Sequence, residues 1–479
     1  MMVNREQMIA EIAQEVIARL QLKLPAPAAI PRPSAGSAHD GVFETVAEAV
    51  PAAVEAQKRV AAMSLEDRGR MVTIIRRVCE ERAHELARME LEETGLGRLD
   101  HKIEKLKAVK HVLGVEAMRS HATSDTSGLC VIEYAPWGVI GMVLPATHPV
   151  PTMASNAINA LAAGNTAVFS PHHAGAKTAA YALQIFNREI QRELRLENAL
   201  TTVREPTIQS AEEIFQHPGV SLLCITGGPA VVQAAMKSGK RVIAAGPGNP
   251  PVVVDETADL SAAAEAVIQG ASFDNNLLCI GEKEVFVVAR VADAFVAAMR
   301  QAGAFELDAA AIDRLTRAAF QFEKDGAGCT HAHVAREMIG KDVTVLAAAA
   351  GVKVPTHTPL LFGDTPEDHP FVQEEQMMPF LPVVRVRDID AAIAAALQAE
   401  RGYRHTALIH SHNIDNVTKM ARAMNTTLFV HNAPCMAALG IGGPGYLSYS
   451  IATPTGEGVT TPLTFTRQRQ IAVAGLRII

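Results

Sequence analysis

Apolar side chains recur at spacings of three and four residues over residues 4–22, near the start of the chain. The stripe contains Met8, Ile9, Ile12, Ala13, Val16, Ile17 and Leu20. This period predicts an amphipathic helix, and Asn4 with Gln7 supplies a capping box at its start. Residues 23–41 are rich in Pro, Ala and Ser without a periodic face, which predicts an extended, flexible linker. The first helix is therefore expected to be tethered to the body of the protein.

From about Val42 the pattern changes to long helical stretches, and then to short apolar runs separated by alanine-rich helices. Helices are predicted over residues 44–62, 64–93, 153–163 and 175–195. Apolar β-rich runs occupy residues 139–144, 166–169, 221–225, 241–243 and 252–254, and again 284–288, 380–386, 406–409 and 427–430. Strand-helix alternation at this spacing predicts right-handed crossovers and doubly wound parallel sheets. The predicted fold class is α/β, with two such domains.

Length and charge narrow the class of protein. The chain has 479 residues, 48% of them hydrophobic and 20% charged, so it can bury the cores of more than one domain. The net charge is −7 and the charges are interspersed, which argues against a nucleic-acid partner. The longest apolar runs are too short to cross a membrane, and the N-terminus lacks the pattern of a secretory signal. We expect small-molecule or protein partners, with no membrane span.

Six cysteines are scattered along the chain without any C-x-x-C pair: Cys79, Cys130, Cys224, Cys279, Cys329 and Cys435. In a long, cysteine-poor chain this pattern is typical of reduced cytoplasmic thiols. Cys79 and Cys224 lie inside apolar patterns and are expected to be buried and inert. Cys435 follows Pro434, where it either packs as a small residue or lines a pocket.

Cys329 is the main alternative to Cys279 as a reactive thiol, because it lies in a glycine-rich loop beside His331 and His333. Three potential ligands within five residues make poor tetrahedral geometry unless a distant fourth ligand joins them. An ordinary polar loop is therefore the preferred interpretation, and no metal site is predicted.

Cys279 stands in a different setting. It follows the polar turn Phe273-Asp-Asn-Asn and precedes a predicted strand, which places the thiol at a loop-strand junction and outside a core run. Nucleophilic catalysis needs a partly accessible thiolate, and adjacent backbone N–H groups can hold an oxyanion formed on a carbonyl carbon. Cys279 is the predicted nucleophile.

A second motif is the turn Thr226-Gly227-Gly228, which connects a buried strand to a helix. Glycines at such a turn let backbone N–H groups and a helix N-terminus approach a phosphate. The motif alone is weak, because ordinary strand-to-helix turns use the same residues.

Together these segments resemble the aldehyde dehydrogenase superfamily. The resemblance rests on Ala135-Pro-Trp-Gly-Val-Ile-Gly-Met-Val-Leu-Pro, on residues 157–172, on the Thr-Gly-Gly turn and on the Cys279 loop, which follow in the family's order over residues 42–479. It implies a nucleotide-binding domain over residues 42–248 and a catalytic domain over residues 249–450. It also implies a small oligomerisation element, formed by inserted strands at 121–137 and by the C-terminal segment 451–479, with its strand at residues 464–473.

The departures from the family pattern narrow the reaction. Hydrolytic members carry a glutamate that activates water in a Glu-Leu-Gly-Gly-Lys type of motif, and Ala245 occupies that position, 34 residues before Cys279. An alanine cannot take a proton from water, so the usual general base for hydrolysis is missing. A thiol such as coenzyme A needs less activation than water does. The resemblance therefore favours the branch that transfers the acyl group to coenzyme A.

By the same resemblance, further residues are assigned to the cofactor and the oxyanion. Thr147 replaces the family's oxyanion-binding asparagine, and Ser170 replaces the lysine that grips the adenosine ribose; His172 either contacts the nucleotide or caps the next helix. The residues expected to bind the cofactor are Pro145, Ser170, Pro171, His172, Thr226, Gly227, Gly228, Gly246 and Glu375. The expected cofactor is NAD, although these residues do not separate NAD from NADP, and coenzyme A is the expected co-substrate.

The N-terminal helix and linker also resemble those of family members that are encapsulated in bacterial microcompartments. The resemblance implies a shell protein that binds residues 4–22, a short-chain aldehyde such as propionaldehyde as substrate, and a homo-oligomer located in the cytoplasm inside a microcompartment. The alternative for the helix is packing on its own subunit. Two alternatives for the function are a hydrolytic enzyme that uses another base, and a catalytically dead scaffold associated with the shell.

Overall fold

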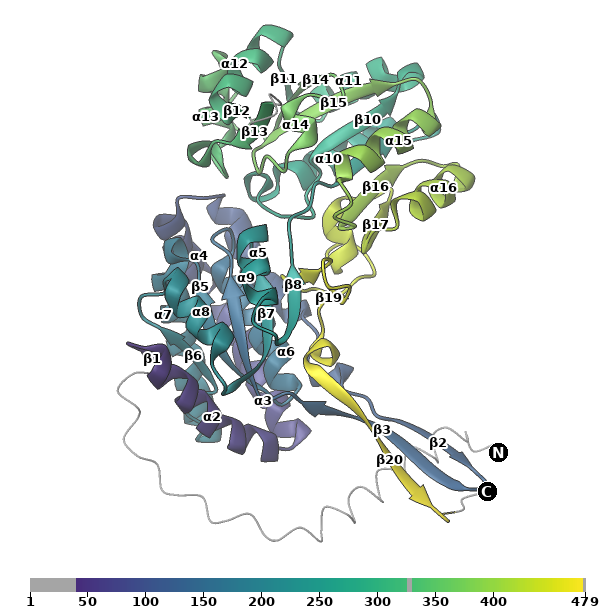
Figure 1. The fold of residues 1–479 in the computed structure, drawn as a ribbon. Helices are drawn as coiled ribbons and strands as arrows, with labels where there is room; N and C mark the ends of the chain where they lie inside the picture. Colours follow the sequence, from purple (N-terminus) through teal and green to yellow (C-terminus); the bar gives the residue numbers. More distant parts are fainter. Residues whose placement is uncertain (1–39, 325–329, 477–479) are drawn as a thin grey trace.

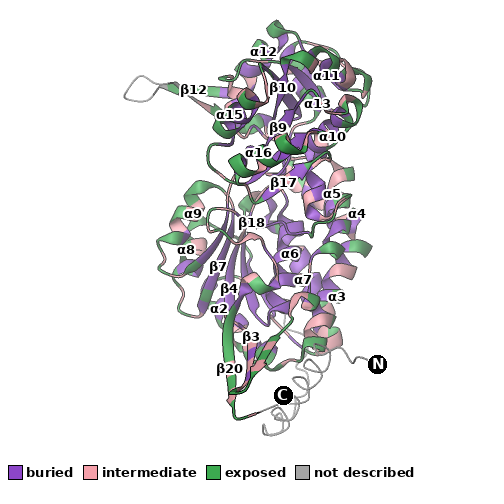
Figure 2. Ribbon diagram, turned by 90° about the vertical axis from the view of Figure 1, so that its right-hand side faces the viewer, coloured by how far each residue is buried: buried purple, intermediate pink, exposed green. Residues whose placement is uncertain are grey.

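The computed structural model describes residues 40–324 and 330–476, and its first domain is built on a six-stranded parallel sheet (Figure 1). The strands lie in the order β1-β6-β5-β4-β7-β8. They are β1 (Val42–Phe43), β4 (Val139–Leu144), β5 (Thr166–Pro171), β6 (Leu200–Val203), β7 (Val220–Thr226) and β8 (Arg241–Ala245). The central strands are buried on both faces, which explains why they appear in the sequence as continuous apolar runs (Figure 2).

Helices cover both faces of this sheet. They are α2 (Val46–Ala62), α3 (Leu65–Glu81), α4 (Ala83–Thr94), α5 (Leu99–Ala108), α6 (Pro149–Ala162), α7 (Ala176–Leu194), α8 (Ile208–Gln216) and α9 (Pro229–Met236), with short 3₁₀ turns η1 (Val109–His111), η2 (Val115–Ala117) and η3 (His173–Gly175). The helix predicted over residues 64–93 is interrupted at Arg82, whose φ of −107° and ψ of 16° are not helical. The apolar stripe runs across the break, so the spacing of apolar residues does not reveal it.

The second domain contains a seven-stranded parallel sheet in the order β11-β14-β15-β10-β9-β16-β17. Its strands are β9 (Pro251–Val254), β10 (Glu284–Val288), β11 (Phe305–Glu306), β14 (Leu361–Asp364), β15 (Phe380–Val386), β16 (Thr406–His410) and β17 (Leu428–His431). Its helices are α10 (Leu260–Ser272), α11 (Ala289–Gln301), α12 (Ala309–Ala319), α13 (Val343–Ala350), α14 (Pro370–Gln373), α15 (Ile389–Glu400) and α16 (Ile414–Met424), with 3₁₀ turns η4 (Phe273–Asn276), η5 (Arg336–Met338) and η6 (Cys435–Leu439). The two parallel α/β sheets confirm the predicted fold class.

Three smaller groups of strands complete the fold. Strand β12 (Phe320–Lys324) pairs antiparallel with β13 (Thr330–Val334). A second short pair is formed by β18 (Ile451–Ala452) and β19 (Gly458–Val459), and η7 (Pro462–Phe465) follows it. Strands β2 (His121–Asp125), β3 (Gly128–Pro136) and β20 (Thr466–Ala474) form an antiparallel sheet that projects from the body (Figure 1). The predicted pairing of the segments near residues 121–137 and 464–473 is therefore present.

Two sequence predictions fall outside the described residues: the helix over residues 4–22 with the linker as far as residue 39, and Cys329. The end of the predicted linker at residues 40 and 41 is described and is packed on the body, because Asp40 pairs with Arg188 at 2.6 Å and the Gly41 carbonyl accepts from the backbone N–H of Thr202 at 2.9 Å. Within the described part of the chain, no helix is long and apolar enough to cross a membrane.

Candidate active site

Cys279 follows a loop of unusual backbone conformation between α10 and β10. Three consecutive non-glycine residues have left-handed backbone, with φ of 51° at Asp274, 56° at Asn275 and 63° at Asn276. Each such residue costs free energy and persists only where its surroundings hold it. Here all three side chains are buried; Asn275 donates to the carbonyl of Gly340 at 2.9 Å, and Asn276 donates to that of Ala271 at 2.8 Å. The segment that presents Cys279 is therefore held rigidly.

A buried ion pair secures the first residue of this loop. The ammonium group of Lys105, on α5, pairs with the carboxylate of Asp274, and both side chains are fully buried. The same carboxylate accepts a hydrogen bond from the backbone N–H of Arg98 at 2.8 Å. Lys105 Nζ also lies 3.5 Å from the carbonyl oxygen of Thr147. The ion pair thus ties α5, the turn after β4 and the Cys279 loop together.

We expect the Asp274→Asn variant to lose about 3–5 kcal/mol of folding free energy, because it leaves the Lys105 charge buried without its partner. Urea unfolding followed by circular dichroism measures the loss. The matched control is Asp313→Asn, which breaks the exposed ion pair with Arg317 on α12 and should change stability very little. Equal stability of the two variants would contradict a role for the buried pair.

Cys279 is half-buried, and its own backbone N–H and that of Ile280 favour the thiolate form of its side chain by hydrogen bonding. Burial, together with the negative charge of Glu375, raises the pKa of the thiol to about 12. The ammonium group of Lys283 and the two N–H groups act in the opposite direction. The reactive thiolate is therefore a minor species near neutral pH in the unliganded protein, and nearby charges control its amount.

Glu375 lies on the loop before β15. Burial raises the pKa of its carboxyl group to about 7, while Lys283 and a hydrogen bond from the backbone N–H of Gly248 favour the charged form. Its charge acts on Cys279, so the predicted cofactor-binding glutamate and the predicted nucleophile are brought together by the fold.

The Glu375→Gln variant is expected to lower the pKa of the Cys279 thiol, because it removes the negative charge that opposes thiolate formation. Iodoacetamide alkylation of Cys279, followed by peptide mass spectrometry, should be about threefold faster or more at pH 8. The difference should vanish below about pH 6, where Glu375 of the wild-type protein is itself protonated. The control is Glu374→Gln, since Glu374 pairs with Arg401 instead. A slower reaction in Glu375→Gln would contradict this electrostatic account.

Sequence reasoning missed His405, which lies directly before β16. Its ring is fully buried and lies close to Gly248. A Cβ built on Gly248 would lie 2.5 Å from the Cys279 carbonyl oxygen and 2.8 Å from His405 Cγ. Nδ1 of His405 hydrogen-bonds with the Thr406 hydroxyl at 2.8 Å, and Nε2 has no protein partner.

Burial lowers the pKa of the His405 ring to about 4, so the ring is neutral at pH 7. A buried polar atom without a partner is costly, which makes Nε2 a ready contact for a bound ligand or water. No sequence motif surrounds His405, and only the pairing of β16 with β9 brings it over Gly248.

The other predicted cofactor-binding residues, and Thr147 of the predicted oxyanion site, gather at the carboxyl edge of the first sheet. Pro145 and Thr147 follow β4, Ser170 and Pro171 end β5, Thr226 ends β7, and Gly246 follows β8. Chain order runs outward from β4 to β5 on one side and to β7 on the other, so this edge is a topological switch point of the kind at which α/β sheets bind ligands.

The turn after β7 leaves room for such a ligand. Gly227 donates to the carbonyl of Ala245 at 3.3 Å, and Gly228 begins α9 with nothing within 4 Å of the position its Cβ would take. On the far side of β4, His172 Nδ1 accepts a hydrogen bond from the backbone N–H of Ala174 at 3.2 Å. This contact is the capping interaction named as the alternative for His172.

Ala245 and Thr147 occupy the positions at which the chain departs from the family pattern. Ala245 ends β8, and its methyl side chain is buried and cannot accept a proton. The Thr147 hydroxyl hydrogen-bonds with His148 Nδ1 at 2.8 Å. The role of Thr147 at the oxyanion remains a prediction.

Three of the remaining described cysteines are buried, and Cys130 is half-buried. Cys79 and Cys224 are fully buried, and burial raises the pKa of both thiols, to about 12 for Cys224. Cys435 is also fully buried, and its backbone N–H donates to Glu282 at 2.9 Å, which favours the packing interpretation. Among the described residues no group of His, Cys, Asp or Glu is arranged to hold a metal ion.

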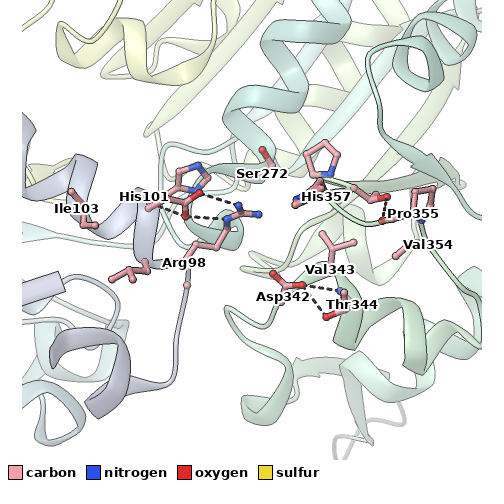
Figure 3. Close-up of a pocket in the computed structure, with 15 residues that line it drawn as sticks. Arg98, His101, Ile103, Ser272, Asp342, Val343, Thr344, Val354, Pro355 and His357 are labelled. Carbon is pink, nitrogen blue, oxygen red and sulfur yellow. Dashed lines mark hydrogen bonds and ion pairs between the residues drawn. The ribbon is translucent and has the colours of Figure 1, made fainter. Parts of the chain in front are cut away.

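An open cleft of about 740 Å³ lies near the N-terminus of α5 and contains none of the predicted site residues (Figure 3). Its wall includes Arg98, His101 and Asp342, together with His357 on the facing loop. His101 Nδ1 accepts a hydrogen bond from the backbone N–H of Asp274 at 2.8 Å. The cleft therefore borders the support of the Cys279 loop and is separate from the sulfur.

The chain as a whole is similar to a known protein family and to several characterised proteins. The aldehyde dehydrogenase family model matches residues 32–445. The acetylating acetaldehyde dehydrogenase of Salmonella typhimurium is 45% identical, over 93% of this chain and 95% of that protein. A crystal structure of Rhodopseudomonas palustris propionaldehyde dehydrogenase, with bound CoA and an acylated cysteine, is 40% identical with a TM-score of 0.87, covering 91% of this chain and 98% of that one. A propionaldehyde dehydrogenase from the Clostridium phytofermentans fucose utilisation microcompartment also has 40% identity and a TM-score of 0.87, with coverage of 92% and 99%.

Proposed function

This chain belongs to the aldehyde dehydrogenase family, and we propose that it oxidises a short-chain aldehyde and transfers the acyl group to coenzyme A. The observation that carries the proposal is the pairing of Cys279, whose sulfur receives two backbone N–H groups, with an alanine at the position of the hydrolytic base. The similar proteins named as acetylating enzymes, and the one crystallised with CoA and an acylated cysteine, support it.

The proposed reaction begins when the Cys279 thiolate attacks the aldehyde carbonyl carbon and forms a C–S bond. The negative charge that develops on the carbonyl oxygen is stabilised by the backbone N–H of Cys279, with Thr147 as the second candidate donor. Bound NAD supplies the acceptor for the hydride that leaves this carbon. Cys279 then holds the acyl group as a thioester.

In the second half of the reaction, the thiolate of coenzyme A attacks the thioester carbon. The C–S bond to Cys279 breaks, acyl-CoA leaves, and Cys279 returns as a thiolate. The overall balance is aldehyde, NAD⁺ and coenzyme A to acyl-CoA, NADH and one proton. Each step is reversible, so reduction of acyl-CoA to the aldehyde is the same chemistry in the opposite direction.

The residues at the sheet edge suit a dinucleotide. The carboxyl ends of β4, β5 and β7 meet there, and the open backbone at Gly228 leads into the N-terminus of α9, where N–H groups favour a phosphate. The charge of Glu375 acts on Cys279, which suits a residue that binds the nicotinamide ribose near the reacting sulfur. The assignment of individual residues to the cofactor is part of the proposal.

The acyl-enzyme step has a direct test. Incubation with propionaldehyde and NAD in the absence of coenzyme A should leave a propionyl group on the peptide that contains Cys279, detected by mass spectrometry. Addition of coenzyme A should remove the group and release propionyl-CoA. Labelling of another residue, or no labelling while NADH forms, would count against Cys279 as the acyl carrier.

Propionaldehyde is the proposed substrate, and acetaldehyde is the nearest alternative, since the similar proteins include enzymes named for each. Comparison of kcat/KM for the two aldehydes under saturating NAD and coenzyme A decides between them. A higher value for acetaldehyde would overturn the choice of propionaldehyde and leave the acylating mechanism intact.

Residues 4–22 are proposed to dock on a microcompartment shell protein, because an isolated helix of this length has an apolar stripe that it cannot bury alone. Deletion of residues 1–39 should abolish co-sedimentation with purified shells and leave aldehyde oxidation unchanged. Loss of activity on deletion would favour packing of the helix on its own subunit.

The sheet β2-β3-β20 is proposed to join subunits of a homo-oligomer, because it projects from the body with exposed strands (Figure 2). Light scattering after deletion of residues 466–479 should then report smaller particles than the full chain does. An unchanged particle mass would refute this role.

A further inference from the structure

Lys283 lies four residues after Cys279, directly before β10, and is completely buried. Its Nζ donates to the carbonyl oxygens of Asn276 at 2.7 Å and Leu278 at 3.1 Å, and also to the side-chain oxygen of Asn276. An ammonium group has three N–H donors, and three oxygen acceptors surround it here. The surroundings therefore match the charged form of Lys283, held in place by the turn that precedes Cys279.

The contact with Leu278 has a geometric consequence for the nucleophile. The carbonyl of Leu278 and the N–H of Cys279 belong to one planar trans peptide group, so they point in opposite directions. Lys283 holds the carbonyl on one side, with a second hydrogen bond from the backbone N–H of Gly281 at 3.0 Å. The Cys279 N–H is thereby turned to the other side, where it and the N–H of Ile280 donate to the sulfur.

We propose that Lys283 is a positioning residue for Cys279: it fixes the Leu278–Cys279 peptide so that the Cys279 N–H faces the sulfur, and it places a positive charge near the thiolate. This proposal rests on the proposed role of Cys279 as nucleophile. The same N–H is the donor available to the oxyanion, so Lys283 supports both the formation of the thiolate and its attack on the aldehyde.

The groups that face Lys283 come from several elements. Burial lowers the pKa of Lys283, whereas Glu375, Cys279, Cys435 and Glu284 favour its charged form. The charge of Lys283 in turn acts on Glu282 and His405. Of the charged side chains that act on Cys279, Lys283 favours the thiolate and Glu375 opposes it. Substitution of Lys283 should therefore move the titration of Cys279 in the direction opposite to substitution of Glu375.

The test compares the rate of iodoacetamide alkylation of Cys279 in Glu375→Gln and in the double variant Glu375→Gln/Lys283→Met, from about pH 6 to about pH 10. This range lies below the titration midpoint of the thiol, so the rate follows the thiolate fraction and the ratio of the two rates gives the shift of the midpoint. The Glu375→Gln background removes the titration of Glu375, which Lys283 also influences. No cofactor or substrate is present, so the result does not depend on which reaction the enzyme catalyses. We expect the midpoint to rise by about one pH unit and the rate at pH 8 to fall about tenfold in the double variant.

A purely structural role for Lys283 would lower the melting temperature without moving this midpoint, and that result would overturn the proposal. If the methionine variant does not fold, Lys283→Gln replaces it, because an amide still donates to the turn carbonyls but carries no charge. Its midpoint should also rise, and an unchanged midpoint would equally overturn the proposal. Failure of the acyl-enzyme test above, with the midpoint shifted as expected, would refute the proposed function and not the role of Lys283.

Discussion

Replacement of Cys279 by serine is expected to reduce NADH formation from aldehyde by roughly 10⁴-fold or more, because removal of a covalent nucleophile removes the intermediate on which both halves of the reaction depend. A serine hydroxyl is far less acidic than a thiol, and among the described residues no carboxylate or histidine is hydrogen-bonded to the Cys279 side chain. The rate of NADH formation is measured by absorbance, with aldehyde, NAD and coenzyme A present.

The matched control for this variant is Cys130→Ser. Cys130 is half-buried in β3, on the projecting sheet, and is not part of the Cys279 loop. It should retain the wild-type rate. Wild-type turnover by the Cys279→Ser variant would refute covalent catalysis at Cys279. An active wild-type protein beside an inactive variant that still binds shells would exclude the catalytically dead scaffold.

The second large effect is expected for Gly248→Ala, because the added methyl group would clash with neighbouring atoms. The new Cβ would lie 2.5 Å from the Cys279 carbonyl oxygen and 2.8 Å from His405 Cγ, closer than atoms in proteins approach. The Cys279 backbone or the His405 ring must therefore move. Displacement of a reacting group by about 1 Å costs about 10²-fold in rate, so kcat should fall by at least that factor.

Gly69→Ala is the comparison for this variant. Gly69 lies inside α3, where a Cβ would meet one methyl group of Val115 at 3.2 Å and where alanine suits a helix better than glycine. That variant should keep the wild-type kcat. A Gly248→Ala enzyme with unchanged kcat would mean that the contact between Gly248, Cys279 and His405 has no part in catalysis.

The sequence predicted the two sheets because their strands are buried on both faces and stand out as apolar runs between alanine-rich helices. It also predicted Cys279 as the nucleophile, because the polar turn before Cys279 and the strand after it place the thiol at a loop-strand junction and outside the core. The assignment of Ala245 needed the resemblance to the family, since an alanine that ends a buried strand carries no chemical signal of its own.

Other features of the site depend on contacts between residues that are distant in the chain. His405 has no motif around it, and it comes close to Cys279 only because β16 lies beside β9. Lys283 stands in the charged run Gly-Glu-Lys-Glu, which by composition resembles an exposed turn, whereas the structure buries it on the carbonyls of the Cys279 loop. The left-handed backbone at Asp274–Asn276 is equally invisible in the spacing of residues.

The hydrolytic alternative depends on whether another group can replace the base that Ala245 lacks. Among the described residues whose charge acts on Cys279, Glu375 is the carboxylate that is in position to replace this base. The pKa of its carboxyl group is about 7. The product that receives the acyl group, acyl-CoA or carboxylic acid, therefore distinguishes the acylating from the hydrolytic reaction more directly than any property of the Cys279 loop.

The decisive measurement is NADH formation from propionaldehyde and NAD by the purified protein, with and without coenzyme A, and with the products identified by mass spectrometry. Sustained turnover that requires coenzyme A and yields propionyl-CoA is the predicted result. Equal rates without coenzyme A, with propionate as the product, would contradict the account and show that the enzyme hydrolyses its acyl intermediate.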